Sequence, residues 1–229
     1  MEECVEKNYL FSSDGKKYLS DTLDENGISS ASLFIKAKNR ANLIKWLRGF
    51  LDPIDEQSKK RAYELYESTL IDENLVGTYK CLRQIHSYLF WGLYDFAGKI
   101  RTKTISKGGF VFANGDFLLQ TLENVDSMPD STFEEIILKY IEMNIAHPFM
   151  EGNGRSTRIW LDMLLKNRLG KCVDWSKVDK KEYLDAMSRA PYESDPICKL
   201  LNNSLTHQIK NREIFMKGID CSYYYEEVE

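Results

Sequence analysis

Apolar residues recur every three to four positions over most of this chain, the spacing typical of amphipathic helices. Within residues 30–51 the stripe contains Leu33, Ala37, Ala41, Ile44 and Leu51. The same pattern predicts further helices over 54–68, 75–94, 116–126, 179–189 and 194–210, and a last one over about 217–226. We therefore expect an all-α protein built as a helical bundle.

Helix starts, ends and breaks can also be placed. Asp52-Pro53 interrupts the apolar pattern, so we divide the chain there into an N-terminal extension, 1–53, and a main domain, 54–229. Ser131 and Glu134 have the spacing of a capping box before another apolar stripe. Gly170 follows a stripe that ends at Leu169, where a C-terminal cap glycine is expected.

One segment does not have the helical pattern. Residues 100–112 are rich in Thr, Ile, Val and Phe, and Gly108-Gly109 lies at their centre. This composition predicts a short β-hairpin in an otherwise helical fold.

Composition narrows the class of protein. The net charge is −4, whereas a general nucleic-acid binder would carry a basic excess, so we expect no direct nucleic-acid binding. The five cysteines are scattered, odd in number and without Cys-x-x-Cys spacing, which favours a reduced, cytoplasmic environment. There is neither a secretory signal nor an apolar run of membrane length, so we expect no membrane partner.

The segment His-Pro-Phe-Met-Glu-Gly-Asn-Gly-Arg-Ser-Thr-Arg, residues 147–158, contains the residues most suited to chemistry. A helix beginning near Gly154 would present free backbone N–H groups to an anion. Gly152 and Gly154 allow close approach of a phosphate, and Asn153 tolerates a left-handed conformation. Arg155 and Arg158, three positions apart, can bind successive phosphates from one side of the helix.

Two further side chains complete this segment. Glu151 is its only carboxylate, and beside a polyphosphate it would hold Mg²⁺. His147 ends the preceding helix, where a neutral imidazole could accept a proton from an attacking hydroxyl. Phe149 is expected to anchor the loop in the core.

Each of these features has a commoner structural role when it occurs alone. Gly-Asn-Gly is usually only a turn, an arginine pair at this spacing is usually a solvated face, and a histidine at a helix end is usually a cap. In this order within twelve positions, however, they favour a phosphate site with a base beside it.

Residues 147–158 resemble the Fic motif, His-x-Phe-x-Asp/Glu-Gly-Asn-Gly-Arg-x-x-Arg, at every specified position, and the resemblance runs from about residue 54 to the C-terminus. It implies a protein adenylyltransferase that transfers AMP from ATP to a protein hydroxyl. His147 would be the base and Glu151 the Mg²⁺ ligand. Gly152, Asn153 and Gly154 would form the anion hole, while Arg155 and Arg158 would bind the remaining phosphates, with Arg158 on the γ-phosphate.

The predicted hairpin resembles the family's flap, which lies over the active site. Its central residues are Ser106, Lys107, Gly108, Gly109 and Phe110. The resemblance implies that an extended target segment pairs with this strand edge through main-chain hydrogen bonds. On composition alone, an ordinary edge hairpin stays open as the alternative.

The C-terminal segment resembles the family's inhibitory motif, Ser/Thr-x-x-x-Glu followed by Gly or Asn. Ser222 and Glu226 are the matching residues, and Glu226 would pair with Arg158 in the space of the γ-phosphate. A C-terminal position is typical of the class III group, in which a tyrosine of the inhibitory helix is self-modified. Tyr223 matches that tyrosine. Glu227 departs from the motif, which leaves the strength of inhibition open.

Class III relatives are bacterial toxins that modify type II topoisomerases on a tyrosine, so the resemblance implies DNA gyrase or topoisomerase IV as the target. Oligomerisation of the chain is a further expectation. Two alternatives stay open: a Doc-like phosphotransferase, and a nucleotide-binding module without catalysis. The intact Gly154 and Arg158 favour AMP transfer over the first, and the presence of His147 and Arg155 argues against the second.

Overall fold

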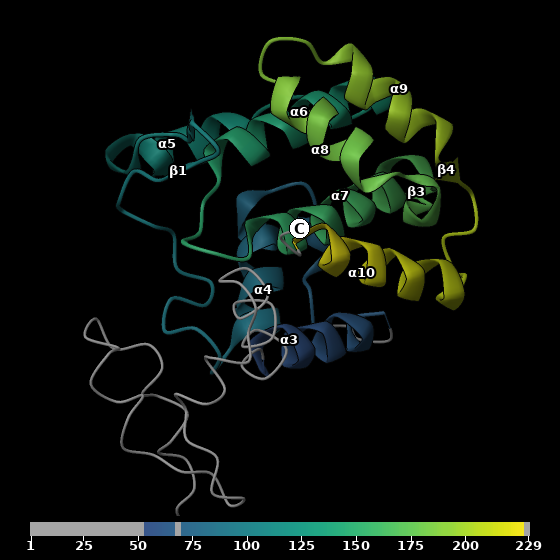
Figure 1. The fold of residues 1–229 in the computed structure, drawn as a ribbon, viewed down its shortest axis with the longest axis horizontal. Helices are drawn as coiled ribbons and strands as arrows, with labels where there is room; N and C mark the ends of the chain where they lie inside the picture. Colours follow the sequence, from purple (N-terminus) through teal and green to yellow (C-terminus); the bar gives the residue numbers. More distant parts are fainter. Residues whose placement is uncertain (1–52, 67–69, 227–229) are drawn as a thin grey trace, which may run out of the picture. The chain divides into compact units, whose positions relative to one another are not determined.

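The computed structural model describes residues 53–66 and 70–226, and this part of the chain is mostly helical (Figure 1). The helices and 3-10 turns follow in the order α3 (Pro53–Glu64), η3 (Glu73–Leu75), α4 (Tyr79–Phe90), η4 (Gly115–Phe117), α5 (Leu118–Asp126), α6 (Phe133–Ala146), α7 (Asn153–Leu169), η5 (Trp175–Lys177), α8 (Lys180–Arg189), α9 (Asp195–Asn203) and α10 (Arg212–Glu226). The prediction of a helical fold with little β structure is confirmed.

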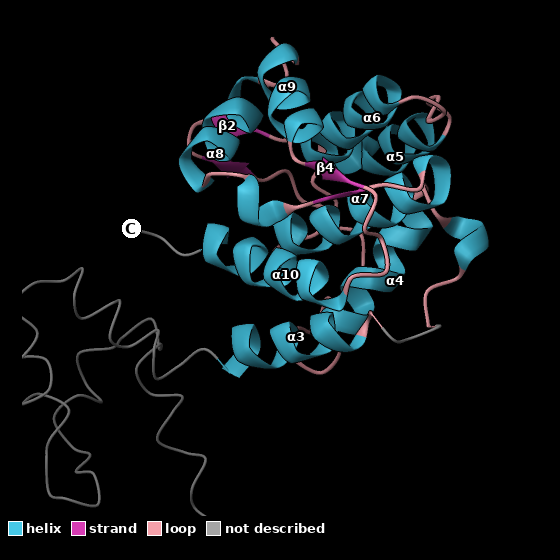
Figure 2. Cartoon of the chain, turned by 90° about the vertical axis from the view of Figure 1, so that its right-hand side faces the viewer, coloured by secondary structure: helices cyan, strands magenta, loops and turns pink. Residues whose placement is uncertain are grey.

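Helix α7, which carries most of the motif, is packed against α4, α6 and α10 (Figure 2). Its side chains Trp160, Leu161 and Leu164 are fully buried. Burial of each such side chain stabilises the fold by about 1.5–3 kcal/mol. Gly170 ends the helix in the left-handed conformation, at φ 60°, as predicted. The helix that presents the motif is therefore held by the core and closed by its own cap.

The capping box of α6 lies one residue later than the sequence predicts. We expected Ser131 and Glu134 to form it, but the Thr132 hydroxyl accepts from the Glu135 N–H at 3.2 Å. The Glu135 carboxylate accepts in return from the N–H groups of Thr132 and Ser131, at 3.0 and 2.8 Å. The physical reason is that this carboxylate meets two backbone donors at the helix start, while Glu134 stays in the exposed first turn.

The predicted hairpin is present. Strand β1 (Ser106–Lys107) pairs antiparallel with β2 (Phe110–Val111), and Ser106 lies opposite Val111. Gly108 and Gly109 both have positive φ, 58° and 84°, the conformation of a type I′ turn. We call residues 105–113 the flap.

A second small sheet was not predicted. Strand β3 (Cys172–Val173) pairs antiparallel with β4 (Leu205–Thr206), and the Asp174 N–H donates to the Ser204 carbonyl at 2.8 Å. The prediction of one helix over 194–210 is therefore wrong, since α9 ends at Asn203 and the chain then becomes extended. Two-residue strands are too short for a period-2 pattern, so the sequence could not indicate this pairing.

Helix α10 is longer than the predicted 217–226, because it already begins at Arg212. The Asn211 side chain accepts from the Glu213 N–H at 2.9 Å and so caps its first turn. On one side α10 packs on α7, and on the other Asp220 pairs with Lys59 of α3 at 2.6 Å. Figures 1 and 2 both show α10 between these two helices. Its last turn is thereby directed at the start of α7.

Some predictions concern residues outside the described part of the chain, namely the helix within 30–51, the N-terminal extension as a unit, and Glu227. Within 53–66 and 70–226, no helix combines the length and apolar character needed to cross a membrane.

Candidate active site

The motif loop and the first turn of α7 form the floor of a large cavity. Gly152 is the N-cap, with φ 79°, and a Cβ atom there would lie 2.5 Å from the Phe90 ring, so only glycine fits. Asn153 does not adopt the left-handed conformation that this residue type tolerates. Asn153 is the first helical residue, and its amide accepts from the Phe149 N–H at 2.9 Å and donates to the Phe149 carbonyl at 2.8 Å. The Asn153 side chain thus holds the loop together. The free backbone N–H groups at the start of α7 remain available to bind an anion.

Phe149 and His86 fix this loop from below. Phe149 is fully buried, as predicted, and stacks on His86 with 3.7 Å between ring centroids. His86, also fully buried, accepts from the Gly98 N–H through Nδ1 and contacts the Glu151 carbonyl through Nε2, both at 2.9 Å. With Nδ1 accepting, Nε2 must carry the proton and donate to that carbonyl. Sequence reasoning missed His86, because it looked like one more position of the α4 stripe.

Burial gives His86 a measurable pH signature. Burial lowers its pKa to about 4, outweighing the hydrogen bond to Glu151, whereas an unfolded histidine titrates near 6.5. Between these values the unfolded chain binds more protons, so the free energy of unfolding should fall as pH falls from about 6.5 to about 4. We expect His86 to account for a loss of about 3 kcal/mol. Urea denaturation across this pH range measures it.

His86→Gln should reduce the slope of this pH dependence of unfolding. Equal slopes for the wild type and His86→Gln would contradict the assignment.

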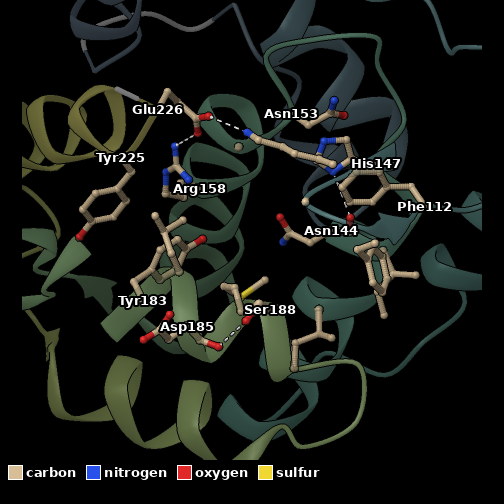
Figure 3. Close-up of a pocket in the computed structure, with 18 of the residues that line it drawn as sticks. Phe112, Asn144, His147, Asn153, Arg158, Tyr183, Asp185, Ser188, Tyr225 and Glu226 are labelled. Atoms are coloured by element: carbon tan, nitrogen blue, oxygen red, sulfur yellow. Dashed lines mark hydrogen bonds and ion pairs between the residues drawn. The ribbon is translucent and has the colours of Figure 1, made fainter. Parts of the chain in front are cut away.

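His147 lies at the end of α6, with its ring directed into the cavity (Figure 3). Its Nδ1 lies 3.2 Å from the Asn144 carbonyl, and its ring stacks on Phe112 of the flap, with centroids 3.7 Å apart. Because a carbonyl only accepts, Nδ1 carries the proton and Nε2 keeps its lone pair. Burial lowers the pKa of His147 to about 4, and the Lys107 and Arg101 charges act in the same direction. The imidazole is therefore neutral at pH 7 and can accept a proton.

Arg158 is buried and engaged by the end of α10. Its Nε donates to the Ser222 hydroxyl at 2.8 Å, and Nη2 donates to the Ser222 carbonyl at 2.8 Å and the Glu226 carboxylate at 2.6 Å (Figure 3). Burial alone would raise the pKa of Glu226, but Arg158 outweighs it and holds that pKa below its usual value. The guanidinium and carboxylate thus form a charged pair at neutral pH.

Aromatic rings hold this pair in place. The guanidinium of Arg158 lies over the rings of Tyr225 and Tyr183, 5.4 and 5.8 Å from their centroids. Those two rings stack at 5.2 Å, and the Tyr225 hydroxyl donates to the Val178 carbonyl at 2.7 Å. The last turn of α10 is therefore anchored by buried contacts as well as by charge.

Arg155 is equally buried and also meets carboxylates. It forms an ion pair with Asp55 of α3, and its Nη2 lies 3.3 Å from the Glu151 carboxylate. Its guanidinium lies 5.0 Å from the Phe90 ring centroid and 5.5 Å from that of Tyr223. Asp55 was not predicted for this site, because it is one of several acidic residues in the first turns of its helix and lies one hundred positions from Arg155.

The flap reaches the same region from the opposite side. Lys107 Nζ lies 3.9 Å from the second carboxylate oxygen of Glu226, and its side chain is 76% exposed. The predicted flap residues Ser106, Gly108 and Phe110 line the cavity with Lys107, whereas Gly109 is not among its lining residues. The exposed edge and the base therefore face one space.

That space is a cavity of about 1150 Å³ between the flap, the motif and α8. It is bordered by His147, Glu151, Asn153, Gly154, Arg158 and Glu226, and on the α8 side by Tyr183, Leu184, Met187 and Ser188. Its volume is that of a site for a drug-sized or nucleotide-sized ligand. Of the predicted residues, Gly152 and Arg155 lie behind the lining, and Glu226 occupies part of the cavity next to Gly154, where a Cβ atom would lie 2.3 Å from it.

Glu151 is the residue to test as a ligand of Mg²⁺. Its carboxylate is exposed at the cavity edge and accepts from the Gly152 N–H at 2.9 Å. Within the described residues no group of three or more His, Cys, Asp or Glu side chains could hold a metal ion. A single exposed carboxylate fits Mg²⁺ that takes its remaining ligands from phosphate and water.

The middle of this chain is similar in sequence to known proteins. Residues 77–165 match the Fic/DOC family. The chain is 30% identical over 145 residues to protein adenylyltransferase VbhT of Bartonella schoenbuchensis, covering 58% of this chain and 30% of the relative. It is 32% identical over 120 residues to the probable protein adenylyltransferase y4lH of Sinorhizobium fredii, covering 47% and 62%. The chain thus spans less than two thirds of these curated relatives.

Solved structures show the same fold. The N-terminal Fic domain of a Bartonella effector protein from Bartonella sp. AR 15-3 superposes with a TM-score of 0.61 at 20% identity, covering 71% of this chain and 84% of that one. BepC of Bartonella tribocorum, solved with bound AMPPNP, gives 0.59 at 21% identity and covers 89% and 99%. The helical Fic fold expected from the sequence is confirmed.

Proposed function

We propose that this chain, whose residues 77–165 match the Fic/DOC family, is a member of that family and a protein adenylyltransferase that transfers AMP from ATP to a hydroxyl of a target protein. The main support is geometric: the imidazole of His147, the open start of α7 and Arg158 border one cavity of about 1150 Å³. A base, an anion hole and a cation are the groups that a nucleotidyl transfer requires. Curated relatives described as protein adenylyltransferases give independent support.

The chemistry is an in-line displacement at the α-phosphorus of ATP. Nε2 of His147 takes the proton of the target hydroxyl, whose oxygen then bonds to the α-phosphorus while the bond to the pyrophosphate oxygen breaks. Backbone N–H groups at Gly152–Gly154 stabilise the charge on the α- and β-phosphates. Arg155 and Arg158 bind the outer phosphates, with Arg158 at the γ-phosphate. The protein contributes positioning and charge rather than a covalent intermediate.

In this proposal Glu151 would hold Mg²⁺. When bound, the ion would neutralise charge on the phosphates and fix their orientation. Glu151 itself is oriented by the Gly152 N–H and by the loop that His86 holds.

We further propose that the chain is inhibited by its own C-terminal helix, as in the class III group. The support is the ion pair of Arg158 with Glu226 at 2.6 Å, because one guanidinium cannot bind this carboxylate and a γ-phosphate together. ATP and the last turn of α10 therefore compete for Arg158. Asp55 holds Arg155 in a similar way, so a nucleotide must displace carboxylates from both arginines.

Self-modification at Tyr223 would relieve this inhibition. The Tyr223 side chain is only 7% exposed and packs against Arg155, so it can accept AMP only after the end of α10 has left the site. An AMP group on this tyrosine could not return to the same buried position. Modification would therefore keep the helix released.

For the external target we propose a tyrosine of a bacterial type II topoisomerase, on the basis of the class III resemblance. The exposed edge of β2, where Val111 is 63% exposed, supports docking of an extended segment of such a target. The acidic net charge suits a protein partner better than DNA.

One experiment tests donor, acceptor and target together. The Glu226→Gly variant is incubated with ATP, Mg²⁺ and a bacterial lysate, and modified proteins are identified by mass spectrometry. We expect AMP on a tyrosine of a topoisomerase subunit and on Tyr223 of the variant itself. A phosphate adduct would instead establish the Doc-like reaction, and a shift in melting temperature with ATP but no adduct would establish a binding module.

A further inference from the structure

Arg101, which lies between α4 and the flap, has a set of partners that the motif does not explain. It is 4% exposed, and burial lowers its pKa. Its guanidinium donates to the carbonyl oxygens of His147 at 2.7 Å, Ala146 at 2.9 Å, Ala113 at 2.7 Å and Lys103. All four acceptors are main-chain carbonyls. A buried cation is therefore used to hold backbone, at a desolvation cost that a carboxylate would ordinarily offset.

Two of these acceptors belong to the strained end of α6. His147 has φ 48° and is the only non-glycine residue with positive φ among the described residues. Such a conformation costs about 1–2 kcal/mol and persists where surrounding contacts hold it. Arg101 holds it twice, since Nε binds the His147 carbonyl and its backbone N–H binds the Pro148 carbonyl at 2.9 Å. Arg101 thus binds the backbone on both sides of the peptide link that follows His147, where the imidazole is directed into the cavity.

The other two acceptors lie at the two ends of the flap segment, one just before it and one at its last residue. Lys103 precedes the flap and Ala113 ends it, and Arg101 binds the carbonyl of each. The same nitrogen, Nη2, binds Ala113 and Ala146, so it joins the end of the flap to the end of α6. A favourable charge at a helix C-terminus would explain only the bonds to α6. The bonds to both ends of the flap need a further reason.

We propose that Arg101 is a positioning residue that sets the distance between the flap and the imidazole of His147. A target segment docked on the flap then presents its hydroxyl to Nε2 without further adjustment. This inference rests on the proposed function, because it assigns the flap to target docking and His147 to proton removal. It adds a residue outside the motif and predicts a specific pattern of defects.

The test uses Arg101→Met and Arg101→Lys in the Glu226→Gly variant. Misplacing reacting groups by about 1 Å costs on the order of 10²-fold in rate, so we expect kcat for AMP transfer to fall by about that factor in Arg101→Met. The dissociation constant for ATP should stay within about twofold, because α7 and its arginines are untouched. Arg101→Lys should recover part of the rate, since one ammonium can replace only some of the bonds.

Arg83→Met is the matched control. Arg83 also donates to a main-chain carbonyl, that of Gly98 at 3.0 Å, but it is exposed and its bond joins neither α6 nor the flap. Its replacement should leave kcat unchanged. The proposal is overturned if Arg101→Met keeps the parent kcat, if Arg83→Met loses as much, or if the affinity for ATP falls in parallel with kcat.

A histidine titration separates this inference from the proposed function. The charges that face His147 are Arg101, Lys107 of the flap and, in the wild type, Glu226 of α10. Burial is the main cause of the low pKa of His147, so an imidazole that leaves its buried position in Arg101→Met should titrate above about 4 when followed by NMR. Arg101→Lys should keep the ring in place and its pKa low. If the parent transfers no AMP, the proposed function fails, and this titration still decides the role of Arg101. An unchanged titration in Arg101→Met overturns it.

Discussion

Replacing Glu226 by glycine is expected to raise the rate of AMP transfer on the order of 10²-fold. The wild-type carboxylate is paired with the buried guanidinium of Arg158 at 2.6 Å, and ATP must break this pair to place its γ-phosphate. A competing carboxylate that opposes ATP binding by about 3 kcal/mol gives this factor, because each 1.4 kcal/mol is a factor of ten in apparent affinity. Initial rates with labelled ATP and a fixed acceptor measure the effect.

Two variants separate the effect of the Glu226 charge from the effect of placing a glycine in α10. Glu226→Gln keeps the side chain but removes its charge, so it should activate less than Glu226→Gly. Glu213→Gly introduces the same residue at the exposed start of α10 and should leave the rate at the wild-type value. Equal rates for Glu226→Gly and wild type at saturating Mg²⁺ and subsaturating ATP would exclude inhibition through Arg158.

Activation should be accompanied by a change in stability. Without Glu226 the charge of Arg158 is buried and uncompensated, so the variant should melt at a lower temperature than wild type in the absence of nucleotide. ATP can then bind the free guanidinium and should raise the melting temperature of the variant more than that of wild type.

The sequence predicts the local half of this site well. The residues from His147 to Arg158 lie within twelve positions, and one helix start brings the glycines, the asparagine and both arginines together. Their positions follow from helix geometry, so the pattern was sufficient to place them. The pattern does not predict the role of the Asn153 side chain. Its amide forms two hydrogen bonds with the Phe149 backbone and so closes the loop.

The residues of the site that lie far from the motif along the chain could not be predicted from sequence spacing. Asp55 meets Arg155 across one hundred positions, His86 meets Glu151 across sixty-five, and Arg101 meets His147 across forty-six. Each is an ordinary polar residue in its own segment, and only the packing of α3, α4 and the flap around α7 gives it a partner. Glu226 lies sixty-eight positions from Arg158 and was found only through the resemblance to the inhibitory motif.

Replacing His147 by alanine in the Glu226→Gly variant is expected to lower AMP transfer by a factor of about 10²–10⁴, the usual contribution of a positioned general base. ATP binding should persist, because the start of α7, Arg155 and Arg158 remain. The physical reason is specific to Nε2: Nδ1 carries the proton for the Asn144 carbonyl, so Nε2 is the lone pair that faces the cavity. Transfer rates and calorimetric titration with ATP measure the two quantities separately.

Arg158→Ala serves as a comparison, because it should weaken ATP binding, whereas His147→Ala should not. Without its guanidinium the γ-phosphate loses its partner, and ATP affinity should fall together with transfer. His207→Ala, at an exposed position, should change neither quantity. If His147→Ala transferred AMP as fast as its parent, the hydroxyl would not need this base, and proton removal would have to be assigned to another group or to solvent. If His147→Ala lost ATP binding as well, the imidazole would support the phosphate site instead of the acceptor.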